Sequence, residues 1–217
     1  MVIATVDWAT IATFATAIGT LVLAIATFAA VRSANLSARV AEASFEANLR
    51  PVLVASRLND LPQKIRWMDD HWARLEGSQA IIEFIDGSIY LAISVRNVGS
   101  GLAVAFGWTV LTDLASGDTP HADPEQFRMQ TRDLYTPAGD IGFWQGAIRD
   151  ASDPDHAALS KDINEARAFT IDVLYGDHEG GQRTITRFGV FPRRDGDETK
   201  WFPAVSRHWN LDRPDPR

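Results

Sequence analysis

The stretch WATIATFATAIGTLVLAIATFAAV, residues 8–31, decides how this chain is built. It contains no charged residue and lies between Asp7 and Arg32. At about 1.5 Å of rise per residue, a helix of this length is roughly 36 Å long, which exceeds the ~30 Å hydrocarbon core of a bilayer. The sequence therefore predicts a transmembrane helix over residues 8–31, preceded by a short N-terminal tail, residues 1–7.

The two ends of this segment carry residues that suit a membrane interface. Trp8 begins it and Arg32 follows it, and aromatic and basic side chains anchor spans at these depths. Arg39 and Arg50 add to the basic residues after the segment, whereas none precedes it. The positive-inside rule thus predicts a single-pass protein with its N-terminus outside and its C-terminal part in the cytoplasm.

A cleavable export signal is the main alternative to a span. Ala24 and Ala26 form the kind of small-residue pair found at cleavage sites. Such a signal also needs a basic start and a shorter apolar region, but residues 1–7 contain neither Lys nor Arg. We therefore favour a helix that stays in the bilayer.

The predicted span has unlike faces. Bulky side chains form one stripe, and small or hydroxyl-bearing residues lie opposite it or on its flank. Small residues let two helices approach closely in lipid, although threonine hydroxyls also bond the carbonyls of their own helix. The candidates for packing against a protein partner's helix or a second copy of this one are Thr13, Ala15, Thr16, Gly19, Thr20 and Thr27.

Residues 32–50 predict a juxtamembrane stalk helix. They are rich in Ala, Leu, Glu and Arg, which favour helix. Pro51 should end it, because the residue before a proline avoids helical dihedral angles.

From residue 51 onward the pattern becomes that of strands. Residues 89–95 alternate apolar and polar side chains, and Asp86-Gly87 joins them to the apolar run 80–85 as a two-residue hairpin turn would. Further strands are expected at 52–54, 104–110, 169–175 and 184–191, with an edge strand at 201–205. The sequence predicts an antiparallel β-sandwich, immunoglobulin-like or related, over residues 51–211, and a flexible tail over 212–217.

One or two short helices are expected to interrupt this mainly β fold. Leu61–Gly77 contains Trp67, Met68, Trp72 and Leu75 at helical spacing, and Ala157–Arg167 also has a helical pattern. Residues 113–137 contain three prolines and predict a long loop.

The segment NVGSGLA, residues 97–103, is typical of a corner between strands. Asn97 can bond nearby backbone, while Gly99 and Gly101 permit a close backbone approach. A phosphate-binding loop would instead need a helix after the glycines, and a strand is expected there.

Two further motifs accompany residues 97–103: Arg50-Pro51 before the first strand, and Tyr175-Gly176-Asp177 before a Thr-rich strand. With these three motifs the chain resembles small bacterial single-pass membrane-anchored β-sandwich proteins, most of which have no assigned activity. The resemblance implies an anchor in the bacterial inner membrane and supplies no catalytic residue.

Composition excludes several functions. The chain has no cysteine, which excludes disulfides, a thiol nucleophile and an iron–sulfur site. Its net charge of −7 argues against nucleic acid as a partner. The first 50 residues are neutral overall, so we expect the acidic remainder to stand off an anionic leaflet.

No catalytic or cofactor motif is present, and no cofactor is expected. Three clusters contain His with carboxylates, namely Asp69-Asp70-His71, Asp153-Pro154-Asp155-His156 and Asp177-His178-Glu179. Asp, Pro and His are ordinary in exposed turns, so we assign no metal or catalytic residue among them.

Seven tryptophans are many for this length. Trp8 is assigned to the membrane interface and Trp108 is expected in the core. The other five either fill the ends of the sandwich or form a contact surface.

These observations favour a membrane-anchored, non-enzymatic protein-interaction module, a subunit or scaffold of a membrane complex. A ligand-sensing domain that signals through the membrane helix and a metal-dependent hydrolase are the alternatives.

Overall fold

The computed structural model describes residues 8–196 and 198–215. The predicted N-terminal tail therefore lies outside the described residues, as does the end of the predicted C-terminal tail. The chain forms two compact units, one ending at Ala47 and the other beginning at Asn48. We describe each unit by itself.

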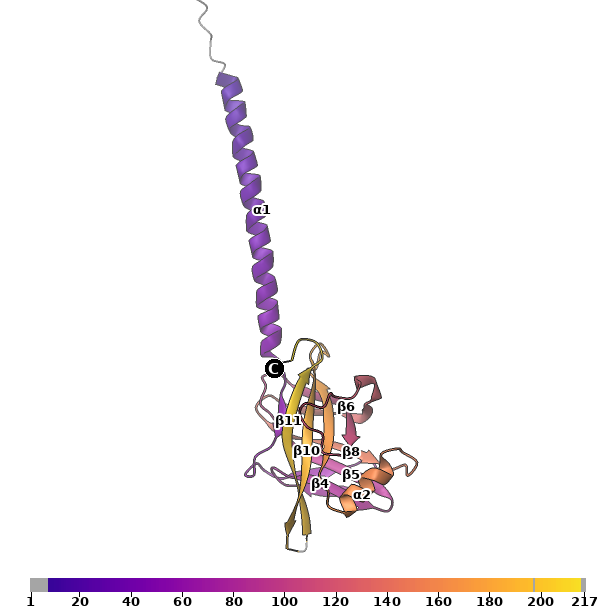
Figure 1. The fold of residues 1–217 in the computed structure, drawn as a ribbon. Helices are drawn as coiled ribbons and strands as arrows, with labels where there is room; N and C mark the ends of the chain where they lie inside the picture. Colours follow the sequence, from indigo (N-terminus) through magenta and orange to yellow (C-terminus); the bar gives the residue numbers. More distant parts are fainter. Residues whose placement is uncertain (1–7, 197, 216–217) are drawn as a thin grey trace, which may run out of the picture. The chain divides into compact units, whose positions relative to one another are not determined.

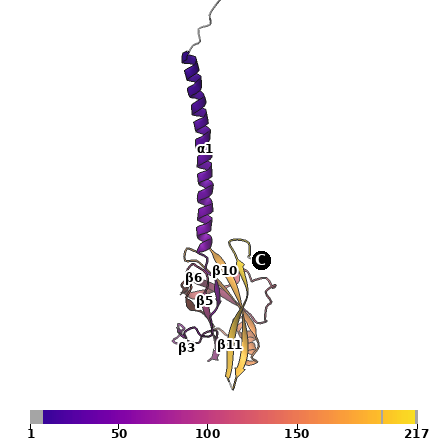
Figure 2. The same cartoon turned by 90° about the vertical axis from the view of Figure 1, so that its left-hand side faces the viewer.

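The described part of the first unit is helix α1, Trp8–Asn48, apart from the last residue of this helix. Figure 2 shows it as one uninterrupted helix. The segment contains no proline, which would break or kink a helix, and only one glycine. The stretch Trp8–Glu42 is long and apolar enough to cross a membrane, and an 18-residue window within it has a mean hydropathy of 2.2. Its large apolar side chains are exposed, as a helix surrounded by lipid would require.

The second unit is mainly β, as predicted. Its elements are β1 (Leu53–Ala55), β2 (Gln63–Arg66), β3 (Trp72–Leu75), β4 (Ala80–Ile85), β5 (Ser88–Asn97), β6 (Ala103–Leu111), η1 (Pro124–Gln126), β7 (Arg128–Thr136), β8 (Ile141–Ile148), α2 (His156–Asn164), β9 (Phe169–Gly176), β10 (Arg183–Asp195) and β11 (Glu198–Asn210).

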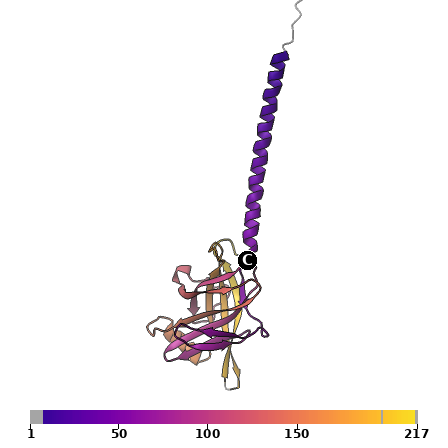
Figure 3. The ribbon, with the colours of Figure 1, turned by 180° about the vertical axis from the view of Figure 1, so that it is seen from behind.

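Nine of these strands form one antiparallel sheet that folds into a sandwich. The order is β1-β5-β4-β11-β10-β9-β6-β7, with β8 on the other edge of β5. Strand β11 meets β4 only at the pair Trp201 and Ala80, and there one layer passes into the other. Figure 1 shows β10 and β11 in front, and Figure 3 shows the layer containing β4 and β5 from behind.

The core lies between the two layers. Ile89, Leu91 and Ile93 of β5 face Trp108, Ile171 and Phe188 of the other layer within one buried cluster. These are the apolar positions that the period of two picked out along β5 and β9, and Trp108 is in the core as expected. Helix α2 confirms the prediction at Ala157–Arg167, and its Leu159 enters the same core.

The predicted hairpin at Asp86-Gly87 is confirmed. Ile85 pairs with Ser88, which leaves two residues in the turn. Asp86 and Gly87 both have positive φ angles, 49° and 80°, as a type I′ turn requires.

The helix predicted at Leu61–Gly77 is wrong, because this segment forms the separate hairpin β2–β3. The chain reverses at Asp70, whose φ of 63° cannot continue a helix. Ile65 and Leu75 alternate into a second apolar cluster, which covers the outer face of β5 at Tyr90 and Ala92. Strand β5 is consequently buried on both faces, although its alternation of apolar and polar side chains predicts burial on one face only.

Two other predictions need correction, and one strand was not predicted. The loop expected over 113–137 ends in strand β7, whose polar middle gives no apolar alternation. The strand at 201–205 is longer and is not an edge, since β11 pairs with both β10 and β4. Strand β8 has two glycines in eight residues and was not predicted.

The corner at Asn97 is confirmed. Its buried side chain accepts hydrogen bonds from the N–H groups of Val52 and Gly99. It donates to the carbonyls of Gly101 and Thr136, at 2.7 and 3.0 Å. A Cβ atom on Gly101 would lie 1.6 Å from the Leu49 carbonyl oxygen, so the backbone approach here admits only glycine.

Candidate functional site

The residues proposed for helix packing all lie on α1. Each of the threonines Thr13, Thr16, Thr20 and Thr27 donates its hydroxyl to the carbonyl four residues earlier, at 2.8 to 2.9 Å. The hydrogen-bond donors of these hydroxyls are therefore satisfied by carbonyls of the same helix. Ala15 and Gly19 are exposed, and a Cβ atom on Gly19 would have no neighbour within 4 Å. Trp8, the first residue of α1, is 76 % exposed.

The acidic and histidine clusters are mostly neutralised by arginines. Asp153 and Asp155 both accept hydrogen bonds from Arg128 at 2.6 Å. Asp69 accepts from Arg149 at 2.8 Å, and this bond holds its pKa well below the usual range. Among the described residues, no group of three His, Asp or Glu side chains is arranged to hold a metal ion.

A polar pocket of about 360 Å³ is the site with the most varied chemistry in the β-unit. It lies between the β6–η1 loop, residues 112–123, and strand β11. Two loop residues, four strand residues and one residue of the C-terminal segment line it. They are Gly117, Asp118, Val205, Ser206, Arg207, His208 and Asp215.

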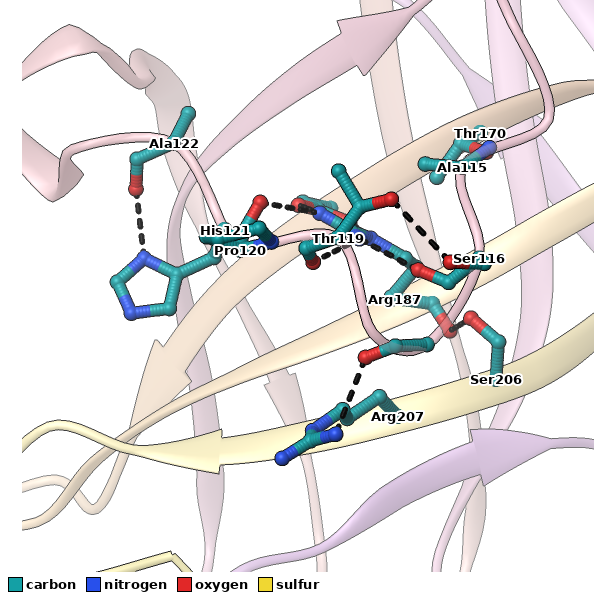
Figure 4. Close-up of polar contacts among 12 residues, drawn as sticks. Ala115, Ser116, Thr119, Pro120, His121, Ala122, Thr170, Arg187, Ser206 and Arg207 are labelled. Carbon is teal, nitrogen blue, oxygen red and sulfur yellow. Dashed lines mark hydrogen bonds and ion pairs between the residues drawn. The ribbon is translucent and has the colours of Figure 1, made fainter.

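The loop that forms one wall is held by a buried arginine. Arg187 of β10 donates to the carbonyls of Ser116, Thr119 and Pro120, at 3.0, 2.7 and 3.3 Å. Figure 4 shows the loop curving around this guanidinium. At the start of the loop, the Thr170 hydroxyl accepts from the Ala115 N–H at 2.9 Å. The loop is therefore fixed to the sheet.

Arg187 is itself neutralised by Asp172 of β9. Its Nε and Nη2 atoms donate to the two carboxylate oxygens at 2.8 and 2.7 Å, and neither side chain is exposed. The guanidinium also lies 4.6 Å from the centre of the Trp209 ring. The ion pair and the cation–π contact hold the Arg187 guanidinium in place, and the loop carbonyls bond to this fixed group.

Arg207 connects the loop to the rim of the pocket. Its Nη1 atom donates to the Gly117 carbonyl at 3.1 Å and lies 3.8 Å from an Asp118 carboxylate oxygen. Figure 4 shows this bond from β11 to the loop. The centre of the Trp209 ring lies 5.6 Å from the Arg207 guanidinium, so the same indole is close to both Arg187 and Arg207.

His208 forms the end of a buried chain of hydrogen bonds. Its Nδ1 atom lies 2.8 Å from the Thr186 hydroxyl, which lies 2.9 Å from the Tyr175 hydroxyl. The Leu53 N–H donates to Tyr175 at 3.0 Å. Burial raises the pKa of Tyr175 to about 12 and lowers the pKa of His208 below its usual value, so both are neutral at pH 7.

The C-terminal segment completes the pocket. Asp215 accepts a hydrogen bond from the Asn210 N–H at 2.9 Å. Asp212 pairs with Arg50 and accepts from the Arg183 N–H. Residues 212–215, which the sequence assigned to a flexible tail, thus contact the sandwich.

This arrangement suits recognition of a small polar ligand. The residues that line it include an arginine, a histidine, a serine and two aspartates. Among residues 8–196 and 198–215, no carboxylate bonds the His208 imidazole, and the Ser206 hydroxyl bonds the Arg187 carbonyl at 3.5 Å instead of the imidazole. The pocket therefore lacks the pairing that activates a serine nucleophile.

Sequence reasoning missed this site. Asp172 and Arg187 each stand alone in the middle of an apolar strand, and opposite charges in two buried strands are a signal of a pair. His208 and the loop carried no such signal, because only the fold brings them together.

No protein-family model matches the chain, and no curated protein or solved structure matches it.

Proposed function

We propose that this protein is a membrane-anchored, non-enzymatic interaction module, in which α1 spans a bacterial inner membrane and the β-sandwich contacts a protein partner. The observation that carries the proposal is the stretch Trp8–Glu42, whose length and mean hydropathy suit a span. The sandwich supplies a rigid platform, because its core is continuous between the layers.

The basic residues after the apolar run support a cytoplasmic sandwich. Arg32 and Arg39 remain exposed on α1. Arg50 is buried and pairs with Asp212, so its charge belongs to the sandwich and does not flank the span. Two arginines and no basic residue before Trp8 favour the N-terminus outside.

Alkaline carbonate washing of native membranes tests the anchor. We expect the full-length protein to stay in the pellet. Release into the supernatant would contradict a span, and a mature protein lacking its first two dozen or so residues by mass spectrometry would indicate a cleaved export signal.

Protease treatment of intact cells tests the orientation. We expect the sandwich to be protected until the cells are opened. Digestion from outside would reverse the topology.

Affinity purification from native membranes in mild detergent tests the role as an interaction module. A stoichiometric protein partner, or a second copy of the chain, is the expected result. A monomer without any companion across several detergents would contradict it.

The polar pocket at β11 favours a second function, sensing of a small ligand. A ligand there would contact Arg207 and His208, and tight binding would raise the melting temperature by mass action. Thermal shift against a metabolite panel separates the two functions when Arg207→Gln is run as the control, since a ligand in this pocket should not stabilise that variant.

A further inference from the structure

The outer face of the β2–β3 hairpin concentrates positive charge on an acidic chain. Along β2 and β3 the side chains alternate, with Ile65 and Leu75 buried, Gln63 and Ala73 part-buried and the other four exposed. The outward residues are Lys64, Arg66, Trp72 and Arg74, which we call the basic hairpin face. Three of the four are cations, although the whole protein carries a net charge of −7.

Like charges meet across this hairpin. Lys64 and Arg74 are directly paired residues of β2 and β3, an arrangement that destabilises an isolated pair of strands. Arg66 and Arg74 have carboxylate neighbours, Asp70 and Glu76. Within the described part of the chain, no carboxylate pairs with Lys64. The face therefore keeps positive charge that an anionic partner would neutralise.

An exposed tryptophan stands among these cations. Trp72 is 48 % exposed, with the Lys64 ammonium 4.5 Å and the Arg66 guanidinium 5.3 Å from its ring centre. A shallow groove of about 460 Å³ runs beside it, lined in part by Lys64 and Arg74. Leu61, just before β2, and Met68, in the turn between β2 and β3, are 75 % and 72 % exposed.

We propose that the basic hairpin face binds anionic phospholipid headgroups of the bilayer that holds α1. Tryptophan, lysine and arginine side chains favour the headgroup level of a bilayer. There the indole ring contacts apolar groups, and the cations contact the charged headgroups. The proposal rests on the proposed membrane anchor, because an anchored hairpin meets headgroups at high effective concentration.

A fluid anionic surface fits this face better than an acidic peptide does. The groove is open and its cations are long, flexible side chains, so it defines no fixed set of hydrogen-bond positions. The net charge alone predicts that the sandwich stands off an anionic leaflet. Salt screens charges beyond a Debye length of about 8 Å, so the interaction of this face with a leaflet depends on the charges close to it.

Hydrogen exchange in nanodiscs tests the proposal on the full chain. The wild-type protein is reconstituted in phosphatidylcholine alone and in phosphatidylcholine mixed with phosphatidylglycerol. We expect backbone amides of residues 62–76 to exchange about fivefold more slowly in the anionic discs, and the difference to vanish in about 1 M salt. Equal exchange in the two lipids would overturn the proposal.

Two charge-matched variants show which cations matter. Lys64→Gln/Arg66→Gln/Arg74→Gln should exchange equally in both lipids, while its urea midpoint stays close to wild type, because the replaced side chains are exposed. Arg193→Gln/Arg194→Gln/Lys200→Gln removes the same charge from the β10–β11 hairpin and should keep the protection. Equal loss in both variants would assign the effect to net charge and overturn the site.

A further arm separates lipid from peptide. Poly-glutamate added to phosphatidylcholine discs should not protect residues 62–76, and protection by the peptide without any lipid effect would replace the proposal with an acidic protein partner. Carbonate washing reports the anchor independently. If the anchor fails, sedimentation of the chain with phosphatidylglycerol vesicles still tests the hairpin face.

Discussion

Arg187 of β10 and Asp172 of β9 are directly paired across the two central strands, and both side chains are completely buried. Their two hydrogen bonds neutralise a charge pair inside an otherwise apolar sheet. The remaining donors of Arg187 reach the carbonyls of the β6–η1 loop. One ion pair thus joins the core to the wall of the polar pocket.

Removal of one partner should therefore cost more than removal of both. We expect Arg187→Met to lower the free energy of unfolding by about 3–5 kcal/mol, because Asp172 is left buried and charged. Arg187→Met/Asp172→Leu should recover much of this loss. Urea denaturation followed by tryptophan fluorescence in detergent measures both, and equal losses would contradict the account.

The same double variant should release the loop. Without Arg187, the carbonyls of Ser116, Thr119 and Pro120 lose their donors. We expect amides of residues 115–121 to exchange faster while those of β9 stay protected. Loop exchange at the wild-type rate would show that other contacts hold it.

Asn97→Ala should destabilise the sandwich by about 3 kcal/mol or more. The substitution removes the partners of four backbone groups at a buried corner, and each unsatisfied group costs about 1–3 kcal/mol. Asn59→Ala, in the exposed turn before β2, is the control and should unfold like the wild type. A small change at Asn97 would mean that water satisfies the corner.

His208 should make stability depend on pH on the acidic side. Burial lowers its pKa in the fold, so the unfolded chain takes up a proton first as the pH falls below about 6.5. The contribution of His208 to the free energy of unfolding is therefore constant above that pH and decreases below it. Urea midpoints from about pH 7.5 to pH 5 should fall less steeply for His208→Gln than for the wild type, and parallel curves would exclude this residue.

Gly19→Leu should weaken self-association of α1 if the small-residue side is the packing face. The glycine has open space around it, so the larger side chain fits the isolated helix but blocks close approach of another. Thr13→Val should change little, since its hydroxyl already bonds the Ala9 carbonyl. Cross-linking in detergent compares them, and a monomeric wild type would remove this interface.

Pattern alone succeeded where a residue's neighbours in sequence are also its neighbours in space. The turn at Asp86-Gly87 and the helix after His156 depend on local dihedral angles, and both were predictable. Strand β7 depends on its partner β6, because its own middle residues are polar. The hairpin β2–β3 was mistaken for a helix because four apolar residues, two in its turn and two in β3, fell at helical spacing.

The sequence by itself determined a long apolar helix, an antiparallel β fold after Pro51 and the glycine corner after Asn97, because these follow from hydropathy, periodicity and backbone sterics. Only the tertiary structure decided which charges are neutralised, which strands are central, and where a pocket opens. Arg187 and Asp172 meet through strand pairing, and His208 lines the same pocket as the β6–η1 loop through the fold of the whole sheet. Such contacts join residues far apart in the chain, so no local pattern encodes them.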